Sequence, residues 1–169
     1  TLGRASQHDV VLTHRRRFAM RKLNPADVPD RIINEAVEAI TRDRSIMDRV
    51  RANREVHGLL RDGYRAEWTD EQGEKRIETL RYLDLSDPAN NDLLAVQQMW
   101  VKGHLHSRRL DLALFVNGVP LVLMEFKEPN QSVKSAYDDN LTDYRDTIPQ
   151  LFIPNCLVLL SNGSQARVG

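Results

Sequence analysis

The sequence predicts an α/β domain in which helices flank a mixed central sheet. Three observations support this fold class. Apolar residues recur at helical spacing in the first third of the chain, short apolar runs separated by turn residues fill the middle, and a helix followed by a buried strand comes last. Elements in this order are typical of one sheet covered by helices. We therefore expect residues 1–169 to form a single domain, which is long enough to bury a core of its own.

Three helices are expected in the first third of the chain. The apolar spacing in the basic segment 1–23 suggests the first helix, and the break at Asn24 and Pro25 ends it. Apolar residues at helical spacing predict a second helix over about 28–41 and a third over about 45–60.

Short strands separated by turns are expected from residue 64 onwards. The two central runs meet at Asn117 and Gly118, a dipeptide that strongly indicates a tight hairpin. A helix over about 132–147 precedes the last strand. The expected strands cover residues 64–68, 76–83, 93–101, 110–116, 119–126 and 157–160.

The composition gives no overall charge that would point to a partner. The 24 Lys and Arg residues balance the 24 Asp and Glu residues, so a nucleic-acid site has to be a local patch. Cys156 is the single cysteine, which excludes an internal disulfide, and no segment approaches the roughly 18 apolar residues of a membrane span. We expect a cytoplasmic protein that does not associate with a membrane.

Three charged residues stand at one end of the apolar central hairpin. Both faces of this hairpin are apolar, which indicates strands that are covered on both sides. Asp111 begins its first run, and Glu125 and Lys127 end its second. Because an unpaired buried charge costs several kcal/mol, these residues need either a structural salt bridge or a metal site. The residues by themselves leave both alternatives open.

The register of the hairpin decides whether the two acids can meet. Glu125 and Lys127 are two residues apart, so they lie on one face of their strand. A plain two-residue turn would place Leu110, rather than Asp111, on that face. One bulged residue, or an odd loop, between Asp111 and Glu125 restores the parity. We therefore predict such an irregularity.

Two carboxylates and an ammonium at one strand end suit metal-assisted phosphodiester hydrolysis. Carboxylate oxygens are preferred ligands of Mg²⁺, which needs few ligands from the protein. A bound cation polarises a phosphate and lowers the pKa of water. Lys127 can orient or help to deprotonate that water, or it can stabilise the negative charge that develops on the phosphate.

Two basic groups are candidates for contacts with DNA phosphates. The basic first segment carries Arg15, Arg16 and Arg17, while Arg108 and Arg109 flank the charged end of the hairpin. The alternative for the first group is a solvated helix face, and for the second an ion pair with a neighbouring acid.

Several pieces of the chain match a known pattern, and they do so in the same order. The longest runs from Arg109 to Lys127 and contains both acids of the hairpin. In these pieces the chain resembles the restriction (R) subunit of type I restriction-modification enzymes, the HsdR family, over most of its length. The other matching pieces are residues 53–60, 90–96, 148–152 and 161–163.

The resemblance implies a restriction-endonuclease-like PD-(D/E)xK fold in an N-terminal endonuclease domain, followed in the family by motor domains. It places the metal-binding Asp and Glu of the family on Asp111 and Glu125 and its Lys on Lys127, with Mg²⁺ or Mn²⁺ as the metal. ATP is expected only in the motor domains, because these 169 residues contain no phosphate-binding loop.

The resemblance also points to residues outside the hairpin. The family carries a Gln-x-x-x-Tyr element in the helix that follows its motif. Here Asn140 stands in place of the Gln and Tyr144 keeps the aromatic ring, so both are candidate active-site residues. In related folds an acid on an upstream helix joins the metal ligands, which makes Glu55 a further candidate. Leu110 replaces the Pro of the motif and leaves the carboxylate unchanged.

The implied function is Mg²⁺-dependent cleavage of double-stranded DNA at non-specific positions. In the family a separate specificity subunit recognises the sequence, so the expected partners are DNA and the modification and specificity subunits. The alternative is a non-catalytic module that binds DNA or docks onto another subunit. In that case Asp111, Glu125 and Lys127 form a structural ion cluster.

Overall fold

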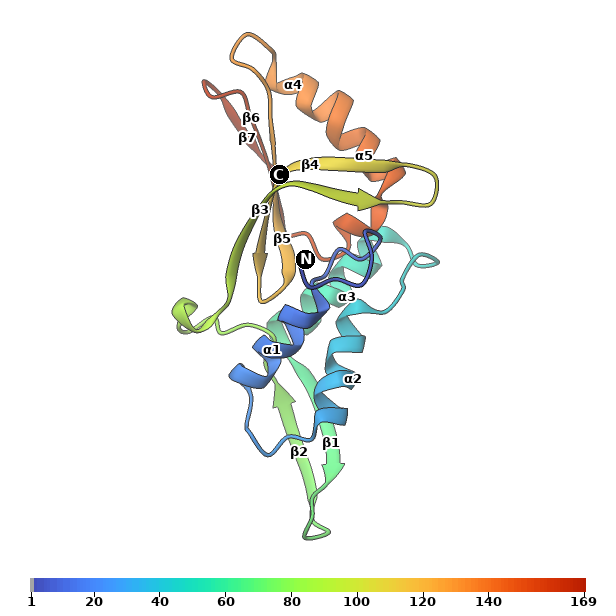
Figure 1. Cartoon of the computed structure of the whole chain (residues 1–169), viewed down its shortest axis with the longest axis vertical. Helices are drawn as coiled ribbons and strands as arrows, with labels where there is room; N and C mark the ends of the chain where they lie inside the picture. The colour runs from blue at the N-terminus through green and yellow to red at the C-terminus, as the bar shows by residue number, and fades with distance from the viewer. Residues whose placement is uncertain (1) are drawn as a thin grey trace.

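The computed structural model describes residues 2–169 and shows an α/β arrangement with two sheets (Figure 1). The expected mixed sheet is confirmed as a five-stranded sheet of order β3-β4-β5-β6-β7. The first two predicted strands do not join it. They are β1 (Tyr64–Thr69) and β2 (Lys75–Leu80), which form a separate antiparallel ribbon of two strands.

Three helices precede the ribbon, as the apolar spacing predicts. They are α1 (Thr13–Leu23), α2 (Asp30–Thr41) and α3 (Arg49–Asp62). The basic segment is helical only from Thr13, because the apolar residues just before it enter the core in a non-helical stretch. In the part of the chain from residue 2 to residue 169, none of the helices has the length and apolar character needed to cross a bilayer.

The large sheet joins an antiparallel meander to a parallel strand. Its strands β3 and β4 pair antiparallel, as do β4 and β5, whereas β5 and β6 run parallel. The short last strand, β7, was not expected and pairs antiparallel with β6. The strands are β3 (Leu93–Lys102), β4 (Ser107–Val116), β5 (Val119–Phe126), β6 (Leu157–Ser161) and β7 (Ala166–Val168).

A helical crossover connects the parallel pair, as such a connection requires. It consists of α4 (Val133–Ser135), a π-helical turn labelled η2 (Ala136–Leu141) and α5 (Thr142–Thr147). The expected helix over 132–147 is therefore confirmed, with an irregular middle. Two short 3₁₀ turns lie in connections between elements. They are η1 (Pro88–Asn90), between β2 and β3, and η3 (Pro149–Phe152), between α5 and β6.

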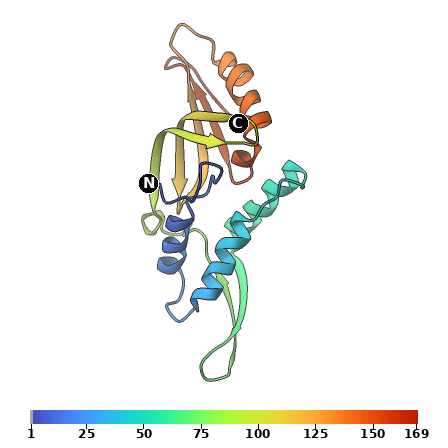
Figure 2. The ribbon, with the colours of Figure 1, turned by 45° about the vertical axis from the view of Figure 1, so that its right-hand side comes forward.

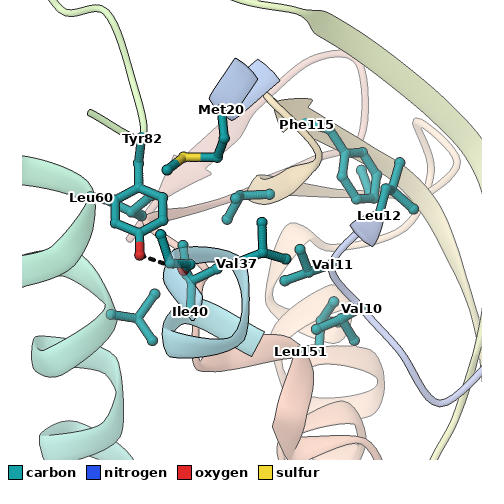
Figure 3. Packing of buried hydrophobic residues seen from close by; sticks show 14 of the residues in the cluster. Val10, Val11, Leu12, Met20, Val37, Ile40, Leu60, Tyr82, Phe115 and Leu151 are labelled. Atoms are coloured by element: carbon teal, nitrogen blue, oxygen red, sulfur yellow. Dashed lines mark hydrogen bonds between the residues drawn. The ribbon is translucent and has the colours of Figure 1, made fainter. Parts of the chain in front are cut away.

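The main core lies between the helices and one face of the large sheet (Figure 3). The segment before α1 contributes Val10, Val11 and Leu12, and Phe115 of β4 belongs to the same cluster. The hydroxyl of Tyr82 donates to the carbonyl of Ala36, so the polar end of this buried ring is satisfied.

The hairpin between β4 and β5 contains the predicted irregularity. Val116 pairs with Val119 across a two-residue turn. Phe115 pairs with Pro120, but Leu114 pairs with Val122, which leaves Leu121 as one extra residue in β5. This single bulge restores the parity that the two acids need.

The β3–β4 hairpin bends sharply along its length (Figure 1). Opposite Asp111 on β3, Gln98 has a φ of 50°, in the left-handed region. The buried side of β4 changes there: Leu110 is buried before Asp111, and Ala113 after it, although the two positions differ in parity. The first acid therefore lies at an elbow of the sheet.

Within residues 2–169, the hairpin is covered by helices on one face and not on both as expected. Ala113, Phe115 and Leu123 are buried against the core, whereas the alternate positions Leu112 and Leu114 remain partly exposed. The helices of the described chain pack against one face of the large sheet and leave these alternate positions bare.

The hairpin turn is held by its first residue, Asn117. Asn117 is fully buried at a φ of 50°. Its side-chain oxygen accepts from the Asp92 amide at 2.7 Å, and its side-chain nitrogen donates to the Tyr82 carbonyl at 3.0 Å and to Asn91 Oδ1 at 2.7 Å. One amide thus ties the turn to the segment between β2 and β3.

We expect Asn117→Ala to lower the free energy of unfolding by about 2–4 kcal/mol, because it leaves buried polar groups without partners. Asn117→Gly removes the same hydrogen bonds but tolerates the positive φ, so it should cost about 1 kcal/mol less. Urea denaturation measures both values. Equal losses for Ala and Gly would contradict the role of the backbone conformation.

Candidate active site

The bulge places Asp111 and Glu125 side by side on adjacent strands. Leu112 pairs with Met124, so the next pair along β4 and β5 is Asp111 with Glu125. The Asp111 amide donates to Glu125 Oε1 at 3.2 Å, and Asp111 Oδ2 accepts from the Phe126 amide at 2.8 Å. The two acids are therefore neighbours on one face of the sheet, which is the geometry that the register argument requires.

An amide side chain from the crossover links Glu125 to Lys127. Asn140 Nδ2 donates to Glu125 Oε2 at 3.0 Å. Its other end, Oδ1, accepts from Lys127 Nζ at 2.8 Å. The structure thus brings Lys127 to the acids through Asn140, and the shorter arm of Asn is long enough to make both contacts.

Tyr144 completes this cluster from α5. Its hydroxyl lies 3.2 Å from Glu125 Oε2 and 3.0 Å from the Arg109 carbonyl, and its single proton serves one of them at a time. Asn140 lies in the π-helical turn and Tyr144 one turn later, so both approach the same carboxylate oxygen. Such turns occur frequently at functional sites.

Burial dominates the electrostatics of Glu125. Its side chain is 2% exposed, and burial raises its pKa to about 7, with a further contribution from the neighbouring Asp111 charge. The hydrogen bonds from Asn140 and Tyr144 act in the opposite direction. Burial also raises the pKa of Tyr144, and the Glu125 carboxylate beside it adds to the shift. A cation between the two acids would relieve this penalty.

The basic residues next to the site have different surroundings. Arg108 forms a two-pronged ion pair with Asp143 on α5, with a contact of 2.7 Å from Nη2 to Oδ1. Hydrogen bonding to Asp143 raises the pKa of Arg108 and lowers that of the acid. Arg109 is exposed, and its carbonyl faces Tyr144. Of the two alternatives, the structure therefore shows the ion pair for Arg108.

The prediction that Arg16 contacts DNA is wrong. Its side chain is fully buried, donates to the Tyr82 carbonyl at 2.8 Å and stacks over the Tyr82 ring at 4.6 Å. Burial lowers its pKa to about 9. The spacing of the buried α1 residues, Arg16, Ala19, Met20 and Leu23, is the signal that could have revealed this.

The other arginines of α1 remain at the surface. Arg15 forms an ion pair with Asp92 at 2.6 Å, and the Arg17 guanidinium lies 3.7 Å from Asp30. Both side chains are partly exposed. The structure does not bring either of them to the carboxylate pair.

Glu55 does not join the two acids, contrary to the prediction. Its Oε1 accepts from Arg42 at 2.5 Å and from Arg44 at 2.8 Å, so two guanidinium groups already neutralise it. Within residues 2–169, no group of three or more His, Cys, Asp or Glu residues is arranged to hold a metal ion. A cation at the candidate site would rely on Asp111 and Glu125 alone among such residues.

The sequence did not identify Gln98 as part of the frame of this site. It faces Asp111 from β3, and its left-handed backbone accompanies the bend of the sheet. Gln rarely adopts a positive φ, so residue type offered no signal at this position.

An α/β fold with these acid, amide and amine side chains fits a domain of a restriction enzyme, and comparison with known proteins identifies the family. The chain belongs to the family described as "Type I restriction enzyme R protein N terminus", whose profile matches residues 1–169. The "Type I restriction enzyme HindI endonuclease subunit" of Haemophilus influenzae is 36% identical over 171 residues, covering 99% of this chain.

A second relative also covers almost the whole of this chain. The "Putative type I restriction enzyme MjaIXP endonuclease subunit" of Methanocaldococcus jannaschii is 28% identical over 174 residues, covering 98% of this chain. The chain spans 16% of the length of each of these two relatives.

We expect the stability of Glu125→Gln, compared with wild type, to be greater above neutral pH than at acid pH. The folded-state pKa of about 7 exceeds the ordinary 4.5, so ionisation of Glu125 opposes folding increasingly as the pH rises through this range. The stability of the variant relative to wild type should therefore increase by up to about 3 kcal/mol between pH 4 and pH 8. Urea denaturation in the presence of a chelator measures this difference.

The matched control for this experiment is Glu128→Gln, because Glu128 is exposed and lies just after β5. Its stability relative to wild type should stay nearly constant over the same pH range. A flat profile for Glu125→Gln as well would contradict the buried, proton-binding state of Glu125.

Proposed function

We propose that this domain hydrolyses phosphodiester bonds of double-stranded DNA with a divalent cation, Mg²⁺ or Mn²⁺, held by Asp111 and Glu125. The observation that carries the proposal is the pairing of these two acids across β4 and β5, with Lys127 joined to Glu125 through Asn140. The printed names of the two relatives, both endonuclease subunits, support it.

The charges of the cluster favour a metal site over a structural ion cluster. Among residues 2–169, the ion pairs include neither Asp111 nor Glu125, and Lys127 points its amine at an amide instead of a carboxylate. A structural cluster would neutralise its own acids. Two neighbouring carboxylates without a cationic side chain are instead suited to a hard divalent cation.

The residues of the chain divide the work of hydrolysis. When bound, the cation polarises the phosphate and lowers the pKa of water. Asn140 and Tyr144 hold Glu125 in place by hydrogen bonds. Lys127 offers its ammonium to the attacking water or to the charge that develops on the phosphate. The water oxygen bonds to phosphorus and gives up one proton to the solvent, the P–O ester bond breaks, and the leaving oxygen takes up one proton from the solvent.

The wider setting of the reaction is also part of this proposal. We place sequence recognition in a separate specificity subunit, so this domain cuts without reading bases, and we expect the modification subunits as further partners. ATP binds in the motor part of the full-length protein. Exposed Arg109, two residues before Asp111 in β4, is a candidate for a phosphate contact, and so are Arg15 and Arg17 on α1.

We expect millimolar Mg²⁺ or Mn²⁺ to raise the melting temperature of the protein by a few degrees. At ten times its dissociation constant, a ligand of the folded state adds about 1.4 kcal/mol of stability, which corresponds to about 3–5 °C for a domain of this size. Asp111→Asn should abolish the rise, whereas the exposed control Asp139→Asn should keep it. Scanning fluorimetry with and without EDTA measures the shift. An equal rise in Asp111→Asn would contradict the assignment of the ligands.

We expect Lys127→Ala to reduce DNA cleavage by at least about 100-fold while leaving the fold intact, because the amine acts on the reacting groups. The assay uses the full-length R subunit assembled with its partner subunits on double-stranded DNA. Lys134→Ala is the matched control, since Lys134 is exposed and pairs with Asp138. Circular dichroism checks the fold of each variant.

Two outcomes of this assay would favour the non-catalytic alternative. One is loss of the fold in both Lys127→Ala and Glu125→Ala, as expected for a structural ion cluster. The other is salt-sensitive DNA binding that needs no divalent cation and survives Glu125→Ala, together with unchanged cleavage in the assembled enzyme.

A further inference from the structure

The large sheet has an apolar face that the described chain leaves uncovered. In a paired sheet, residues opposite one another point to the same side. Leu112 pairs with Met124, and Met124 pairs with Leu159. These positions alternate with the core positions Ala113, Leu123 and Leu160, so they form the outer face of the sheet.

None of the outer positions takes part in the hydrophobic clusters of residues 2–169. Both clusters contain inner positions of the same strands, but neither contains the outer ones. The outer side chains that extend over the three central strands are Leu112, Leu114, Val122, Met124 and Leu159.

All nearby helices lie on the opposite face. The crossover from α4 to α5 packs on Leu160 and Val158, which are inner positions of β6. Figure 2 shows α4 and α5 together on one side of the large sheet. The segment before α1 lies on the inner side, where Leu12 and Phe115 belong to one cluster (Figure 3). A sheet with a parallel pair is ordinarily covered on both sides.

The outer face is unsuited to nucleic acid. Its cross-strand rows carry Ala95, Leu114, Val122 and Leu157 in one row, and Gln97, Leu112, Met124, Leu159 and Val168 in the next. These rows contain no charged side chain that could bind a phosphate. Leu157 is 36% exposed and Val168 63% exposed, so the apolar surface reaches the edge of the sheet. A continuous apolar patch of this kind is typical of a protein interface.

We propose that this outer face binds the polypeptide that follows residue 169 in the full-length chain, as one or more amphipathic helices. The matching family is an N-terminal one, and the two relatives contain about six times the length that this chain matches. Val168 pairs with Leu159, so the chain passes residue 169 at the rim of this same face. The next segment begins beside the surface that it would cover.

The test measures chemical access to the outer face in the full-length chain. Val122→Cys is placed in a background whose exposed cysteines, Cys156 included, are replaced by Ser. The matched control is Glu78→Cys on the exposed face of β2. We expect a maleimide to label Val122→Cys at least 10-fold more slowly than Glu78→Cys in native protein, and equally fast in denaturant. Equal rates in native protein would overturn the proposal.

Two further measurements identify the occupant. Protection that disappears on dilution would assign the face to a second copy of the chain and would overturn the proposal. A benzophenone maleimide attached at Val122→Cys should cross-link to a peptide that follows residue 169, as read by mass spectrometry. A cross-link to a peptide within residues 2–169, or to another subunit, would likewise overturn it.

Discussion

The single bulged residue in β5 is the constraint on which the candidate site depends. Without Leu121 as an extra residue, Asp111 would point to the opposite side of the sheet from Glu125 and Lys127. With it, both acids come from hydrogen-bonded strands, and β3 adopts the left-handed backbone of Gln98 opposite the first acid. The site is thus set by backbone pairing more than by contacts between the charged side chains themselves.

Glu125 shows how the surrounding structure resists the charge that a metal site needs. Burial and the nearby Asp111 both favour a protonated carboxyl, while donors from Asn140 and Tyr144 favour the ionised form. The balance lies near neutrality, so a modest external influence can shift it. The charge of Glu125 therefore depends on the charges that lie close to it.

The spacing of apolar residues and the Asn117-Gly118 turn predicted the mixed sheet and the central hairpin. The need for a bulge followed from the strict alternation of side chains along a strand. These patterns did not predict which of three consecutive arginines would be buried, although helical geometry requires that one of them face inward when Ala19 and Met20 do. Apolar residues on both faces of the hairpin predicted cover on both sides. The described chain supplies helices for one face only. The apolar pattern therefore indicates a need for cover on the second face, which residues 2–169 do not provide.

The attachment of Lys127 has a consequence for how an incoming group is received. An ammonium carries three N–H bonds, and the amide of Asn140 occupies one of them. Because that amide is neutral, it holds the amine in place and leaves its charge uncompensated. A carboxylate in the same place would neutralise the amine. The side chain is therefore held in one position and keeps its positive charge, and its two other N–H bonds can donate to the oxygens of an anion.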